Sequence, residues 1–168
     1  MANDYDRGRL AANFSEACAS HGANENSRFL SALSEARQGV EAYHQQMIDG
    51  VQSLDTSPTA KAGMLNEISN AYGQYYKSRK NSDPTDVKAQ TIDDMRSTIQ
   101  SFKDTAERWG LDQSNPAQST TRTHFDVENK INALDHASDN LINCRNAPPP
   151  APVQPGARSS GPVVAGLG

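Results

Sequence analysis

The apolar residues of this chain recur at alternating spacings of three and four, which is the period of one face of an α-helix. The most regular stretch covers residues 91–110, where six apolar residues follow this spacing. These positions are Ile92, Met95, Ile99, Phe102, Ala106 and Trp109. The pattern predicts a helix, and its apolar face must either close on the protein's own core or contact a partner.

The same spacing, applied along the whole chain, predicts five helices, at about residues 4–21, 27–54, 58–80, 84–110 and 124–145. Proline suits the first helical position, so Pro58 and Pro84 mark two of the starts. Gly22 is interpreted as the C-cap that separates the first two helices. Thr123 and Asp126 form a capping pair for the last helix. No run of residues alternates as a strand should. The one Asp-Gly pair, Asp49-Gly50, lies inside the predicted helix of residues 27–54 rather than between two strands.

Long helices joined by short connections favour an antiparallel, up-and-down arrangement. We therefore predict an all-α fold, an elongated antiparallel bundle of four to five helices that pack like a coiled coil, over residues 1–146. Residues 147–168 contain six of the nine prolines together with Gly and Ser. This composition predicts a disordered Pro/Gly/Ser-rich C-terminal tail.

Composition and charge narrow the function classes. Leu, Ile, Val and Phe make up 26 of 168 residues, but the net charge is only -4, so the chain has a lean ordered core rather than the composition of a disordered protein. The mild acidity argues against a nucleic-acid partner. No apolar run approaches the length of a membrane span, and the amino end lacks a Sec signal pattern. We expect a cytoplasmic location, or export by a route without a Sec signal peptide. Two reduced thiols are the default for Cys18 and Cys144, although they could meet if the first and last helices are neighbours.

Catalytic and metal-binding motifs are missing from the sequence, including HExxH, zinc-ligand clusters, GxSxG and glycine-rich phosphate loops. Cys18 and His21 are a nucleophile and a base three residues apart, but Cys18 lies near the C-terminal end of its predicted helix, where the helix dipole disfavours a thiolate. Asp135 and Asp139 share a helical face that could hold a cation weakly, although acids on a polar face are common. We predict no catalytic residue, no cofactor and no metal ligand.

Two groups of residues are candidates for contact with a partner. Tyrosines alternate with basic side chains near residue 76, at Tyr72, Tyr76, Lys77, Arg79 and Lys80. Such a mixture can hold single-stranded nucleic acid. Basic residues in a last helical turn also stabilise the helix end, and they could meet an acidic partner. In an acidic protein the structural role is the simpler interpretation.

The second group is Trp109 with Leu111, at the end of the regular stripe. Trp109 is the only tryptophan in the chain, and tryptophan is enriched among the anchor residues of protein interfaces. Core packing is the competing and simpler explanation.

In composition, though not in any motif, the chain is similar to small bacterial secreted effectors and to small helical components of phage particles. We predict a non-catalytic helical module for protein–protein interaction, such as a secreted effector or regulator in bacterial virulence, which binds another protein or a second copy of itself. One alternative is a structural subunit of a larger assembly, such as a virion component, with the tail as an arm. A further alternative is an enzyme that uses a thiol.

Overall fold

A computed structural model describes the backbone of residues 4–80, 83–114 and 119–146, and the side chains of residues 24–80, 83–112 and 119–146. The chain divides into two compact units, residues 29–138 and residues 1–28 with 139–168. The domain predicted for residues 1–146 stays a prediction, and the predicted tail lies outside the described residues.

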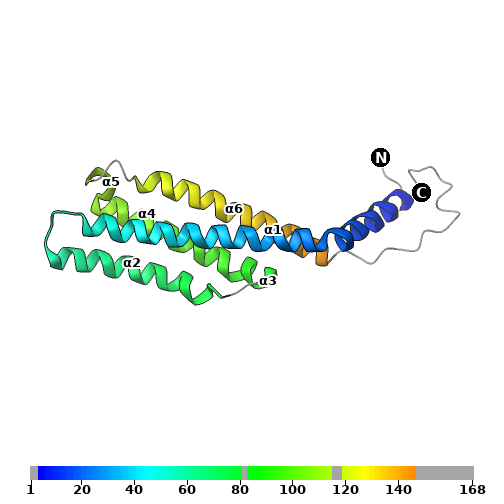
Figure 1. Ribbon diagram of the computed structural model, residues 1–168, viewed down its shortest axis with the longest axis horizontal. Helices are drawn as coiled ribbons and strands as arrows, with labels where there is room; N and C mark the ends of the chain where they lie inside the picture. Colours follow the sequence, from blue (N-terminus) through cyan, green and yellow to red (C-terminus); the bar gives the residue numbers. More distant parts are fainter. Residues whose placement is uncertain (1–3, 81–82, 115–118, 147–168) are drawn as a thin grey trace. The chain divides into compact units, whose positions relative to one another are not determined.

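The described ranges are helical and contain no strand, which confirms the all-α prediction. In chain order the elements are α1 (Asp4–Gln52), α2 (Pro58–Ser78), α3 (Pro84–Asp86), the π-helical turn η1 (Val87–Thr91), α4 (Ile92–Trp109), α5 (Leu111–Ser114) and α6 (Thr120–Arg145). Figure 1 shows the four long helices, α1, α2, α4 and α6, of which α1 and α6 contribute residues to both units.

Contacts within residues 29–138 show that neighbouring helices run antiparallel. Thr98 of α4 bonds Ala71 of α2, and Thr91 at the end of η1 bonds Ser78 of α2. Residue numbers therefore rise along one helix as they fall along the other. The contacts of α1 with α2 and α6 run in the same antiparallel direction. So do the contacts of α6 with the segment from α3 to α4, where Pro84, Lys88 and Arg96 meet Ser138, Asp135 and Asn132 in turn. The predicted antiparallel bundle is therefore confirmed for this unit.

The apolar stripe of residues 91–110 closes on the protein's own core at every position except Trp109. Its buried members are at most 3% exposed: Ile92, Met95, Ile99, Phe102 and Ala106. The stripe predicted within residues 27–54 is buried in the same way from Phe29 to Val51. Each large apolar side chain buried in this manner contributes about 1.5–3 kcal/mol to stability. Trp109 remains 38% exposed.

A row of buried threonines joins η1 and α4 to α2. They recur every seven residues: Thr91, Thr98 and Thr105. Thr98 Oγ1 donates to the main-chain oxygen of Ala71 at 2.9 Å, and Thr105 Oγ1 donates to the Glu67 carboxylate at 3.4 Å. A buried hydroxyl without a partner would be destabilising, so these bonds favour one register between the two helices.

The helices predicted for residues 4–21 and 27–54 are one helix, α1, so the C-cap predicted at Gly22 is wrong. An interior glycine weakens a helix by only about 1 kcal/mol relative to Ala, and no proline interrupts this stretch. The described glycine with a left-handed backbone is Gly110, at φ 65°, and it ends α4.

The helix starts predicted at Pro58 and Pro84 are confirmed. The Ser57 side chain accepts a hydrogen bond from the amide of Ala60 at 3.1 Å, and Asp83 accepts one from Thr85 at 2.9 Å. Each cap satisfies an amide that has no partner within its helix. From Pro84 the chain passes through the wider turn η1 into α4.

Helix α6 begins at Thr120, four residues before the predicted start. Asp112 in α5 caps it: one carboxylate oxygen accepts from the Thr120 amide at 2.8 Å and from its hydroxyl at 2.7 Å. The capping pair predicted at Thr123 and Asp126 is wrong, because both residues lie inside the helix. The true acceptor lies eight residues upstream of Thr120, in a separate helix, beyond the reach of a local capping pattern.

In the unit of residues 1–28 and 139–168, Leu141 and Cys144 are buried on α6. Cys144 is disulfide-bonded, so the expectation of a reduced thiol is wrong for this residue. The side chain of Cys18 lies outside the described residues.

The Asp112 cap predicts a pH-dependent contribution to stability. Burial acts to raise the pKa of the Asp112 carboxyl, but hydrogen bonds from Thr120 and Thr121 outweigh it and hold the pKa below its ordinary value of 3.8. A lowered pKa in the folded state stabilises the fold above pH 4 or so, and this contribution is lost as the pH falls through the folded-state pKa.

We therefore expect Asp112→Ala to lower the free energy of unfolding by about 0.5–2 kcal/mol at pH 7. Urea unfolding of both proteins at pH 7 and near pH 3 measures the difference, which should shrink at the lower pH. Asp112→Asn, which keeps one carbonyl acceptor, is the control for charge. A difference that is equal or larger near pH 3 would contradict the role of the ionised carboxylate.

Candidate interaction surfaces

Trp109, the last residue of α4, is held in place although it is partly exposed. Its indole Nε1–H donates to the Glu67 carboxylate of α2 at 3.2 Å. The same carboxylate pairs with Arg108 and accepts from Thr105. The ring is therefore fixed by a polar contact rather than by burial in the core, which was the simpler expectation.

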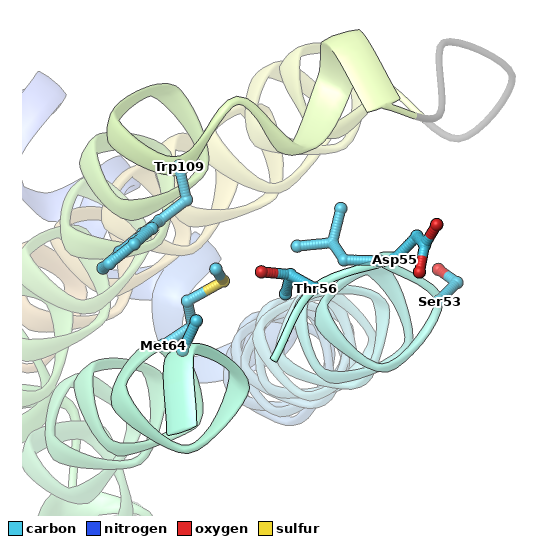
Figure 2. Close-up of a pocket in the computed structure, with 7 residues that line it drawn as sticks. Ser53, Asp55, Thr56, Met64 and Trp109 are labelled. Atoms are coloured by element: carbon cyan, nitrogen blue, oxygen red, sulfur yellow. The ribbon is translucent and has the colours of Figure 1, made fainter. Parts of the chain in front are cut away.

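The indole forms one wall of an open pocket of about 510 Å³. Residues 53–56, which connect α1 to α2, line it together with Ala60, Met64 and Trp109. Figure 2 shows the indole next to Met64, with the side chains of Ser53 and Asp55 farther from it. We call this the Trp109 pocket. The lining is mixed: Met64 and Trp109 supply apolar surface, and Ser53, Asp55 and Thr56 supply polar groups. An open pocket with an aromatic wall can accept a side chain of a partner protein.

A second groove of about 320 Å³ lies between α2 and α4 and shares Glu67 with the Trp109 contacts. Its lining is mostly polar and includes Asn70, Gln74 and Asp104. It offers no aromatic wall, so the Trp109 pocket is the better candidate for an apolar anchor.

Leu111 does not belong to this surface. It follows Gly110 at the start of α5 and is only 4% exposed. The left-handed backbone of Gly110 turns the chain at this point, so the chain leaves α4 and Leu111 packs into the core. Leu111 was predicted to contact a partner, but its buried side chain is not available for such a contact.

The structure places the second predicted group together at the end of α2. We call the group the aromatic–basic face: Tyr72, Tyr76, Lys77, Arg79 and Lys80. Tyr76 is 50% exposed, the two lysines are exposed, and Tyr72 and Arg79 are partly buried.

The aromatic rings of this face are stacked against neighbours within the unit. Tyr72 stacks on His44 of α1, with ring centroids 3.9 Å apart and planes 11° apart. The Arg79 guanidinium lies over the Tyr76 ring, 4.5 Å from its centroid. Burial lowers the pKa of His44, which favours the neutral imidazole in the stack.

Arg79 has further contacts that limit its motion. Its guanidinium lies 3.8 Å from the Glu41 carboxylate of α1. The buried Tyr75 hydroxyl donates to Glu41 at 3.0 Å and so orients that carboxylate. Burial, followed by this bond, raises the pKa of Tyr75 and keeps it a donor. Glu41 and His44 were not predicted as site residues, because they lie on another helix.

The other groups considered in the sequence have structural partners or lie outside the described side chains. Asp135 pairs with Lys88 and Arg96, and the bond from Lys88 contributes most to lowering the pKa of its carboxyl. Among the described residues, no cluster of three or more His, Cys, Asp or Glu side chains could hold a metal ion. Cys18 and His21 lie before the first described side chain.

Comparison with known protein families, curated proteins and solved structures found no match. Within the described ranges, no helix has the length and apolar character needed to cross a membrane. The fold and the two surfaces thus define a class: an antiparallel helical bundle with a partly exposed tryptophan pocket and a separate aromatic–basic face.

Proposed function

We propose that this protein is a non-catalytic interaction module, which binds a partner protein by accepting an apolar side chain of the partner into the Trp109 pocket. The observation that carries the proposal is the position of the only tryptophan, 38% exposed in the wall of a pocket of about 510 Å³. The effector and virion-subunit interpretations of the sequence stay predictions.

The energetics support a binding role. A tryptophan side chain offers up to about 250 Å² of surface, so covering the exposed 38% of Trp109 stabilises a complex by roughly 2 kcal/mol. The bond from the indole to Glu67 fixes the ring before any partner arrives. Less conformational entropy is then lost on binding, which strengthens the complex further.

Replacement of Trp109 tests the proposal. We expect Trp109→Ala to keep the helical circular dichroism spectrum but to weaken binding of the partner by at least about 30-fold, corresponding to a loss of about 2 kcal/mol. The partner is first recovered with tagged wild-type chain from cells that make the protein, and is identified by mass spectrometry. Its affinity for each variant is then measured by calorimetry.

Phe125→Ala is the matched control, because Phe125 on α6 is a 60% exposed aromatic residue outside the pocket. This variant should bind like the wild type. The proposal fails if a folded Trp109→Ala variant binds the partner normally, or if both variants weaken binding equally.

The disulfide at Cys144 favours the exported location over the cytoplasmic one. Disulfides persist in oxidising compartments and are rare in the cytosol, where thiols are kept reduced. We therefore propose that the module acts outside the reducing cytoplasm.

Alkylation without reductant tests this location. Protein from its native source is denatured in iodoacetamide and digested, and the peptide that contains Cys144 is followed by mass spectrometry. We expect Cys144 to remain unmodified until a reductant is added, because its sulfur is bonded to another cysteine. Complete alkylation before reduction would show a free thiol and would argue for a reducing compartment.

A further inference from the structure

We infer that the aromatic–basic face of α2 is a second docking surface, and that its occupant is an acidic segment of a protein, whose carboxylates contact Lys77, Arg79 and Lys80. This inference rests on contacts at the C-terminal end of α2, whereas the Trp109 pocket involves its first turns. It therefore does not depend on the function proposed for that pocket.

Charge complementarity identifies the occupant. The chain carries a net charge of -4, yet three cations lie within four consecutive positions from Lys77 to Lys80. Lys77 and Lys80 are exposed, and neither forms an ion pair with a described acidic side chain. The C-terminal end of a helix carries only a partial negative charge, and a nearby cation stabilises it by only about 0.3–1 kcal/mol. The helix end therefore does not neutralise the positive charge of these three side chains.

Arg79 supplies a preorganised carboxylate receptor. The Tyr76 ring and the Glu41 carboxylate hold its guanidinium, and the ion-pair distance to Glu41 is 3.8 Å. At this distance the pair is looser than a direct hydrogen bond, so donors of the guanidinium can still bind a second carboxylate. Because the side chain is already oriented, less entropy is lost when a carboxylate binds.

The aromatic contacts favour an acidic peptide over single-stranded nucleic acid. Bases bind such surfaces by stacking on open aromatic faces. Here one face of Tyr72 is covered by His44, and one face of Tyr76 is covered by Arg79. Tyr76 therefore orients the Arg79 guanidinium instead of offering that face to a base, and an oriented guanidinium suits a carboxylate.

The surface of α2 beside the tyrosines also leaves room for the main chain of an occupant. Gly73 lies one helical turn before Tyr76, on the same side of α2. A Cβ atom built at Gly73 would meet nothing within 4 Å. The main chain of an occupant can therefore approach α2 closely at this point.

Peptide selection followed by titration tests the inference. The immobilised full chain selects from displayed random twelve-residue peptides, and we expect the selected peptides to be enriched in Asp and Glu relative to the library. The best peptide, labelled with fluorescein, is titrated by anisotropy. We expect the double variant Lys77→Glu/Lys80→Glu to raise its Kd by at least about tenfold, because attraction is replaced by repulsion.

The matched control is the double variant Lys103→Glu/Lys130→Glu. It changes the net charge of the protein by the same amount, but at positions on α4 and α6. It should leave the Kd within about twofold of the wild type, and Trp109→Ala should do the same. The inference is overturned if the selected peptides are not enriched in Asp and Glu, or if the two double variants weaken peptide binding equally. It is also overturned if fluorescein-labelled twelve-residue oligo(dT) binds more tightly than the peptide, or if Trp109→Ala abolishes peptide binding.

Discussion

The Glu67 carboxylate is the contact on which the geometry of the Trp109 pocket depends. It lies on α2 and binds Thr105, Arg108 and Trp109, all in the last part of α4. Thr105 is buried, whereas Trp109 is partly exposed. One acidic group therefore connects the packed seam between two helices to an aromatic side chain at the surface. Without this contact, Trp109 would be a rotatable side chain at a helix end rather than a fixed wall.

Helix α2 presents both candidate surfaces. Met64 lines the Trp109 pocket, and Tyr76 belongs to the aromatic–basic face. These residues are twelve positions apart, or roughly 18 Å along the helix axis. The threonine bonds to α4 and the contacts of His44 and Glu41 from α1 hold α2 on both sides. A partner with an apolar anchor and an acidic segment could engage both surfaces at once and gain avidity without new contacts.

The helices and most of the core could be predicted because their signals are local: apolar spacing, a proline at a helix start, an acceptor just before it. The contacts that build the surfaces join distant positions. Glu67 meets Trp109 across 42 residues, and His44 stacks on Tyr72 from another helix. Nothing in the pattern around residue 109 shows that the stripe leaves the core there. The helix end predicted at Gly22 was wrong because a glycine is only a weak local signal for ending a helix, and the helix-forming residues on both sides overcome it.

The single tryptophan allows one direct measurement of the central claim, that Trp109 is an exposed wall which a partner covers. Acrylamide quenching of Trp109 fluorescence is measured for the free protein and for the purified complex with the partner. We expect ready quenching in the free protein, because 38% of the residue is exposed, and a several-fold smaller quenching constant in the complex. Weak quenching in the free protein, or equal quenching in the complex, would contradict the claim.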